Sequence, residues 1–424
     1  MLRRAPVTTQ LAIPYGILIL PQALLYGNEH IAFIVGILGL ALAGCAPVEV
    51  LLRTRRRDEL LVASRERLES YGGILRVVAL LACAAGQASG IVSASFGVGT
   101  VAAQLGLIRP LTPVGPLLSI FSTWTVSGAA LLVAAHLAGQ LTRRTLNLCF
   151  LIVITLEGVR TAITTITASL ISLTVYLVIL GIFAGTLRLR TCVLAVVAVL
   201  LIWPSVYELR NAIRQESGVH VSASVDAFDR LRYDQQISRA ADIVDIPIDI
   251  GQPDLPDTLR YGLIPRFLDP DRPTLSTGNR INVFLGGTQT SSFTFLPVTT
   301  LYVLQGPLAT VAFYAVLAII LAIALRSGSR LTPWRLIVFG LVSAGPLSWF
   351  AGYPDSTIGC IQGLVAALPL LAVLHLARRR RMLPSPDAPR RWTRGRSVRD
   401  PVAPPDRRRG LPEDHQVEPD RPAA

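Results

Sequence analysis

The stretch IAFIVGILGLALAGCAPVEVLL, residues 31–52, holds a single charged side chain, Glu49. A helix needs about 20 apolar residues to cross the hydrocarbon core of a bilayer. The backbone inside a bilayer must satisfy its own hydrogen bonds, so an apolar run of this length is expected to be helical. The stretch therefore predicts a membrane-spanning α-helix.

The same pattern recurs along the chain of 424 residues, of which 51% are hydrophobic. The apolar residues gather in long blocks with few charges and do not follow an amphipathic spacing. Ten such blocks lie at about 10–27, 31–52, 77–96, 115–139, 145–159, 163–187, 191–207, 297–325, 336–353 and 358–377. We therefore predict an all-α integral membrane protein with about ten transmembrane helices.

The distribution of arginine indicates the orientation of these helices. All 40 basic residues are arginine, and the net charge is +13. With the N-terminus placed in the cytoplasm, the short outer connections hold only Arg109 and Arg160, whereas the inner connections are rich in arginine. Both termini are then cytoplasmic, as in a multi-pass protein of the cytoplasmic (inner) membrane. Because the basic charge lies in short loops and a tail, nucleic-acid binding is not expected.

One connection, between the seventh and eighth blocks, is much longer than the others. It runs from Glu208 to Leu296 on the outer face and carries nine arginines and twelve acidic residues. Helices are predicted at 207–220 and 224–246, the second from apolar residues at mixed three- and four-residue spacing. The predicted organisation is 1–207 with seven helices, 208–296 as an extracytoplasmic loop, 297–381 with three helices, and 382–424 as a disordered cytoplasmic tail.

Arg160 is the first candidate for a functional role. It follows Glu157 by three residues near the outer end of the fifth block, so both side chains share a helix face. A charge at the edge of a span is costly unless it is paired or faces a cavity. Arg160 is therefore either a structural ion-pair partner of Glu157 or an anion-binding group.

The second candidate region is YGLIPRFLDPDRPTLSTGNRINVFLGG, residues 261–287, in the long outer connection. Arg266 and Arg272 flank Asp269 and Asp271, which leaves two interpretations open. The four charges either stiffen the loop as ion pairs, or the arginines grip a phosphate while a carboxylate accepts a proton. Arg280 is a weaker phosphate candidate in the same connection.

Histidine gives little further information. His220 lies in the long outer connection, and a lone histidine is more often structural than functional. No two histidines have metal-ligand spacing, so no metal is predicted.

Three of these segments resemble bacterial polysaccharide polymerases of the Wzy type, the oligosaccharide repeat unit polymerases. The stretch IPRFLDPDRP is similar to the family's Pro-Arg-aromatic-x-x-Pro-acid-basic-Pro segment. LEGVRTAI, with Gly158 and Arg160, resembles the family's Gly-x-Arg at an outer helix end. The hydroxyl-rich stretch TQTSSFTFLPVTTLYVLQG, with Tyr302 and Gly306, looks like the segment that comes after the Pro-Arg stretch in the family. Asp269 stands where the family often has an aromatic residue, so a catalytic role is not assigned to it.

The resemblance implies polymerisation of lipid-linked repeat units into a surface polysaccharide, by a metal-independent glycosyl transfer without a cofactor. The donor would be a glycan on polyprenyl pyrophosphate, and the acceptor a second lipid-linked unit. Arg160, Arg266, Arg272 and Arg280 would bind pyrophosphate, and Asp271 or His220 would serve as the base. Expected partners are these glycans, membrane lipids, a flippase and a chain-length regulator.

Two alternatives remain open from the sequence. An O-antigen ligase or a related lipid-linked-sugar glycosyltransferase shares the layout and donor but differs in acceptor. A polysaccharide flippase or transporter would need polar residues deep in several spans, or an internal repeat. Most blocks are uniformly apolar and no repeat is evident.

Overall fold

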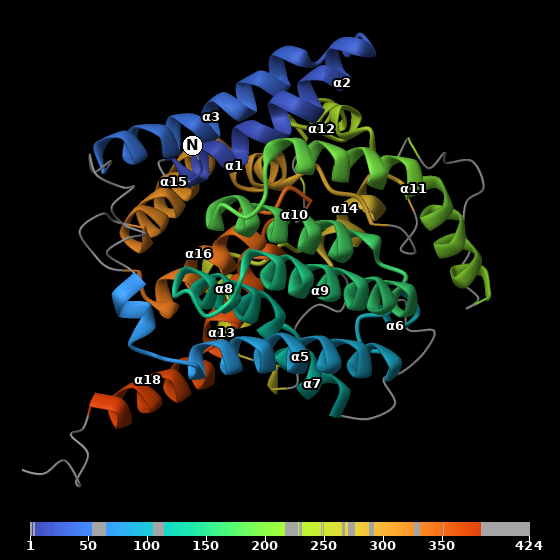
Figure 1. Ribbon diagram of the computed structural model, residues 1–424. Coiled ribbons are helices and arrows are strands. Elements are labelled where there is room, and N and C mark those ends of the chain that lie inside the picture. The colour runs from blue at the N-terminus through green and yellow to red at the C-terminus, as the bar shows by residue number, and fades with distance from the viewer. Residues whose placement is uncertain are drawn as a thin grey trace, which may run out of the picture. The chain divides into compact units, whose positions relative to one another are not determined.

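A computed structural model of the chain contains only helices as regular elements among the residues it describes, and these helices run side by side (Figure 1). The described residues are 2, 5–52, 65–104, 114–216, 228, 231–246, 248, 250–264, 268–269, 276–287, 292–325, 331–350 and 352–382. The prediction of an all-α fold is confirmed for this part of the chain.

Eight helices in the described residues are long and apolar enough to cross a membrane. Their elements are α1 (Pro6–Pro14) continuing through the π-helical turn η1 (Tyr15–Ile19) into α2 (Leu20–Leu25), α3 (Ile31–Leu51), α5 (Ile74–Ser95), α7 (Val114–Ser122) with α8 (Trp124–Leu137), α9 (Arg143–Thr164), α10 (Thr167–Ala184), α15 (Pro297–Ala324), and α17 (Asp355–Ala366) with α18 (Leu368–Met382). The protein is therefore a multi-pass membrane protein.

The two remaining predicted blocks have a different outcome. The seventh lies in α11 (Leu189–Glu216), a 28-residue helix whose side chains at 189–200 fall outside the described part. The ninth forms α16 (Pro333–Ala344), whose 12 residues are about 18 Å long at 1.5 Å per residue, less than the bilayer core. Pro346 explains the early end, since proline cannot continue a helix and disfavours helical backbone at Gly345.

The start of α1 is fixed by an acidic side chain from the next helix. Glu49 of α3 is 3% exposed, and its carboxylate accepts the backbone N–H groups of Val7 at 2.8 Å and Thr8 at 3.2 Å. These N–H groups have no partner within the helix, and a negative charge at a helix N-terminus is favourable. The single charge in the stretch 31–52 thus has a structural role.

Close backbone contacts at glycine hold the long helices together. A Cβ atom added at Gly44 of α3 would lie 2.2 Å from the backbone oxygen of Val311 in α15. A Cβ at Gly86 of α5 would lie 2.4 Å from the backbone nitrogen of Thr125 in α8. Only glycine fits at these positions, which is the usual way in which membrane helices approach closely.

The long connection between α11 and α15 contains three short helices in its described residues: α12 (Tyr233–Ala241), α13 (Leu255–Leu263) and α14 (Thr277–Phe284). The predicted helix 207–220 is in part the end of α11, because helix continues to Glu216, and 217–220 lie outside the described residues. Of the predicted helix 224–246, α12 covers only the central part.

Two of these helices are held to α17. Gln362 donates through Nε2 to the carbonyl of Tyr261 in α13 at 2.8 Å. Asp355 accepts the backbone N–H of Thr277 at 2.9 Å and its hydroxyl at 3.1 Å, which holds the start of α14. Helix α17 is therefore an anchor for both α13 and α14.

A matched pair of substitutions in α3 tests the close packing. Gly44→Ala should lower the melting temperature of the purified protein, because overpacking of this kind costs about 1–3 kcal/mol and the atom in the way is backbone. Gly39→Ala is the control, since a Cβ there meets nothing within 4 Å. Equal melting temperatures for the two variants would contradict the packing described here.

Candidate functional site

Arg160 lies in the last turn of α9, where the sequence places an outer helix end. Its Nη1 atom is 3.4 Å from both carboxylate oxygens of Glu157, one turn earlier. The Arg160 side chain is 32% exposed, whereas Glu157 is 4% exposed. The ion pair predicted from the three-residue spacing is therefore present, with the acid buried and the guanidinium partly open.

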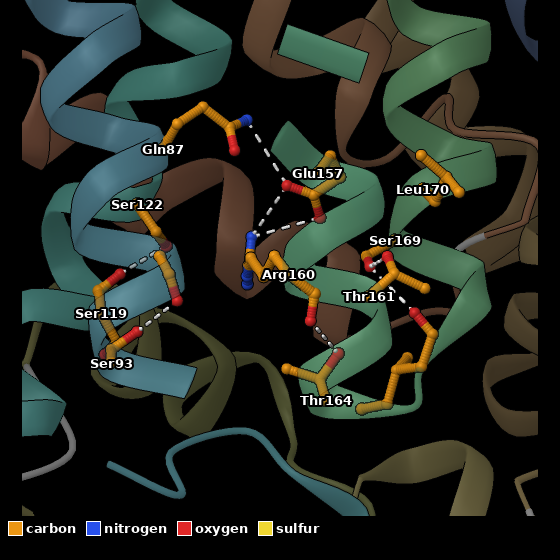
Figure 2. A network of polar contacts seen from close by, with 12 residues as sticks. Gln87, Ser93, Ser119, Ser122, Glu157, Arg160, Thr161, Thr164, Ser169 and Leu170 are labelled. Atoms are coloured by element: carbon orange, nitrogen blue, oxygen red, sulfur yellow. Dashed lines mark hydrogen bonds and ion pairs between the residues drawn. The ribbon is translucent and has the colours of Figure 1, made fainter. Parts of the chain in front are cut away.

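The neighbouring helix α5 completes the surroundings of this pair (Figure 2). Gln87 is buried, and its Nε2 atom is 3.5 Å from Glu157 Oε2. One turn further along α5, a Cβ at Gly90 would lie 3.2 Å from Cδ of Arg160. The glycine thus leaves room for the arginine stem, and Gln87 and Arg160 both contact the Glu157 carboxylate.

Several small hydroxyl side chains are found on the helices near Arg160. In Figure 2, Ser93, Ser119 and Ser122 lie on one side of Arg160, and Thr161 and Thr164 on the other. The Thr164 hydroxyl donates to the Arg160 carbonyl at 3.1 Å, and the Ser93 hydroxyl donates to the Gly90 carbonyl at 3.0 Å. The environment of Arg160 is polar, and a second arginine, Arg214 of α11, donates to the carbonyl of Thr165 at the end of α9 at 2.9 Å.

This arrangement leaves donor atoms of Arg160 available. Of its three nitrogen atoms, only Nη1 makes a hydrogen bond to a described residue. Guanidinium groups bind phosphate through two parallel N–H groups, and Nε and Nη2 form such an edge. Because Glu157 holds Nη1, Arg160 can present the edge formed by Nε and Nη2 to an anion.

Arg280, the weaker phosphate candidate, makes several contacts within the protein. Its Nη1 atom donates to the backbone oxygen of Ile250 at 2.8 Å and to that of Gly251, and Nη2 is 3.4 Å from the Thr277 hydroxyl. These contacts fasten the chain at 250–251 to α14. Among the described residues, no contact joins this cluster to that of Arg160, so the two arginines belong to separate networks.

The other predicted site residues lie largely outside the described part. Arg266, Asp271, Arg272 and His220 are not in the described ranges. Asp269 is described, and it forms an ion pair with Arg260 of α13. Asp269 is 2% exposed. Its partner Arg260 is not one of the two arginines that flank it in the sequence, so the interpretation of the four loop charges as ion pairs stays a prediction.

Sequence reasoning missed a charged cluster that joins the turn between α2 and α3 to α12. Arg232 binds both carboxylate oxygens of Asp234, at 2.8 and 2.9 Å, and stacks on Tyr26 with Cζ 3.6 Å from the ring centroid. Asn28 donates to the same carboxylate at 3.0 Å and accepts from Ser238 at 2.7 Å. The polar tripeptide at 28–30 was the only feature of the sequence that could have indicated this cluster. Its partners lie about 200 residues later in the chain, and no sequence pattern connects them to it.

A third group of polar side chains lies between the helices, around a small cavity. A cavity of about 20 Å³, room for one water molecule, is lined by residues of α1, η1, α15 and the segment after α16. Five of its lining side chains have buried polar atoms without a protein partner among the described residues: Gln10, Tyr15, Tyr314, Ser348 and Trp349. None of the predicted site residues is among them.

No group of three or more His, Cys, Asp or Glu side chains within the described ranges could hold a metal ion. Comparison of the chain with protein-family models, with curated proteins and with solved structures finds no match. The candidate site therefore stands on its geometry alone.

The acidic residue of the α12 cluster gives a prediction about pH. Burial raises the pKa of Asp234, but the hydrogen bonds from Arg232 and Asn28 and the charge of Arg232 outweigh it, so the pKa lies below its usual value. The stabilisation is therefore present above the unfolded pKa of about 4 and is lost as the pH falls through the lower folded value.

Below about pH 4, hydrogen exchange of α12 should speed up relative to that of α5. Asp234→Asn should show fast exchange of α12 already at neutral pH and a flatter dependence on pH. If hydrogen exchange of α12 depended on pH in the same way in the wild-type protein and in Asp234→Asn, the assignment of this effect to Asp234 would be contradicted.

Two buried tyrosines allow a test of the unpartnered hydroxyls. The Tyr176 hydroxyl donates to the Val126 carbonyl at 2.8 Å, whereas the Tyr314 hydroxyl has no partner among the described residues. Tyr176→Phe should lower stability by about 1 kcal/mol, and Tyr314→Phe should leave it unchanged or raise it. The measurement is the melting temperature of each purified variant. An equal decrease in both variants would mean that the Tyr314 hydroxyl has a hydrogen-bond partner.

Proposed function

We propose that this protein is a membrane-embedded glycosyltransferase that polymerises polyprenyl-pyrophosphate-linked repeat units into a surface polysaccharide. The reaction takes place on the outer face of the cytoplasmic membrane and uses no metal ion. The proposal rests on the resemblance of three segments to Wzy-type polymerases and on one structural observation, the setting of Arg160. The other arginines assigned by the resemblance, Arg266, Arg272 and Arg280, remain part of the proposal.

The observation that carries the proposal is a half-open guanidinium held by a buried acid at a helix end. Glu157, which itself accepts from Gln87, holds Arg160 through Nη1, and Nε and Nη2 are left for a ligand. A fixed guanidinium needs no reorganisation when negative charge develops beside it. A purely structural ion pair would not require the partial exposure of the arginine.

The chemistry that this site would serve is the departure of a pyrophosphate. The acceptor hydroxyl oxygen bonds to the anomeric carbon of the donor glycan, and the bond from that carbon to the pyrophosphate oxygen breaks. Arg160 stabilises the charge that develops on that oxygen, which is the role a metal ion has in other transferases. The acceptor proton passes to Asp271 or His220, the two bases that the sequence offers in the outer connection.

Substitutions of Arg160 test this function directly in a host that makes the corresponding glycan. Arg160→Gln removes the charge and should slow polymer formation by isolated membranes about 100-fold or more, as does loss of one charge-stabilising donor in other enzymes. Arg160→Lys keeps the charge but loses the planar edge, so it should restore activity only in part. Lipid-linked glycans separated on a gel give the measurement.

The matched control is Arg76→Lys, an exposed arginine at the start of α5, away from the site. It should leave the ladder of long chains unchanged at equal membrane abundance. Wild-type activity in Arg160→Gln would exclude the proposed site. Single units trapped on the cytoplasmic side would indicate a flippase, and long lipid-linked chains without transfer to a final acceptor would indicate a ligase.

A further inference from the structure

A groove lies at the arginine-rich end of the bundle, beside the last helix. Its free volume is about 200 Å³. Its walls come from three parts of the chain and consist of Tyr71, Thr332, Pro333, Trp334, Leu371, Leu374 and His375. The proposed function makes no use of this groove.

The groove has an apolar floor and an aromatic rim. Leu374 is 1% exposed and Tyr71 is 8% exposed, so both belong to the packed interior. Trp334, at the start of α16, is 44% exposed. Tryptophan in such a position is typical of the interface between hydrocarbon and headgroups. The groove is therefore open at the depth at which a lipid glycerol backbone lies.

Positive charge is concentrated directly beside this groove. After its apolar part, α18 carries four consecutive arginines at 378–381. The Arg378 guanidinium lies over the Tyr71 ring at 5.4 Å from its centroid, and its Nε atom is buried without a partner among the described residues. Arg379 and Arg380 are exposed, and neither forms an ion pair with a described acid.

The position of these arginines at a helix end accounts for part of the positive charge, but it does not account for the groove beside them. Cations are favourable at a helix C-terminus and on the cytoplasmic side of a span. Neither effect requires an arginine to lie over a tyrosine that forms the wall of an open apolar groove. An apolar groove next to a cluster of cations is complementary to an amphipathic anion.

We propose that this groove binds one anionic phospholipid at the arginine-rich face of the membrane. The lipid phosphate contacts Arg378, Arg379 and Arg380, which offer paired N–H donors. The upper part of an acyl chain lies in the groove against Leu374 and Tyr71, and Trp334 covers it from the rim. A zwitterionic lipid fits the groove equally well but gains less from the arginine cluster, so the site selects for net negative charge.

The test uses the full chain, purified in a mild detergent and exposed to equal amounts of phosphatidylglycerol and phosphatidylcholine. Native mass spectrometry then counts the lipids retained. The wild-type protein should keep one phosphatidylglycerol in preference to phosphatidylcholine. Replacing Arg378, Arg379 and Arg380 together by Gln should reduce this preference by about 5-fold for each arginine, since one arginine near an anionic surface contributes about 1 kcal/mol.

Two further variants separate a built site from general attraction by positive charge. Arg143→Gln with Arg144→Gln removes two exposed arginines at the start of α9, on the same side as predicted from the sequence, and should leave the preference unchanged. Leu371→Trp fills the groove and keeps every charge, so it should abolish retention. Trp334→Ala opens the rim and should weaken retention if the filled variant does not fold.

The result that overturns the proposal is equally specific. No preference in the wild-type protein, or an equal loss in the Arg143/Arg144 variant, would show that the groove is not a lipid site. Full retention in folded Leu371→Trp would show that the lipid lies elsewhere. None of these results depends on glycosyl transfer, so failure here would leave the proposed function untouched.

Discussion

The arrangement of this protein depends on direct contact between helix backbones at glycine. Gly86 and Gly128 allow α5 and α8 to approach until a Cβ atom would lie 2.4 Å from Thr125 and 2.7 Å from Cys83. In a bilayer, apolar side chains have no preference for each other over lipid tails, so such contacts contribute much of the association. Gly90 continues the row of Gly86 one turn further, because residues four apart share a helix face.

The same row of glycines positions the candidate site. Because Gly90 has no side chain, Arg160 of α9 can lie against α5, and because α5 is close, Gln87 can reach Glu157. A buried carboxylate without these partners would be costly inside a membrane protein. The polar contacts of the site therefore depend on the close packing of α5 against α9. A bulky residue at position 90 would displace the Arg160 side chain.

Hydropathy alone predicted the helical fold, and most of the blocks became long helices. It failed at α16, where the apolar run continues but Gly345 and Pro346 end the helix at Ala344. Between α11 and α15, amphipathic spacing placed α12 approximately, but the contacts of its start with Tyr26 and Asn28 are not revealed by any local pattern.

The candidate site was predictable only where its residues are neighbours in sequence. The Glu157–Arg160 pair follows from three-residue spacing on a helix. Gln87 and Gly90 lie some 70 residues earlier in α5 and look like ordinary members of an apolar block. Arg280 has the residue type of a phosphate ligand, but its contacts with the backbone oxygens of Ile250 and Gly251 could not be predicted from the sequence. Residue type predicted a possible chemistry, and packing decided how it is used.

The central claim is that the protein itself transfers glycan from polyprenyl pyrophosphate. The most direct test is to place the purified protein in liposomes with a single lipid-linked repeat unit, a chelator and no other protein. The account predicts chains of two or more units, with one free polyprenyl pyrophosphate released for each new linkage. Movement of intact single units across the bilayer, with no longer chains and no released pyrophosphate lipid, would contradict it.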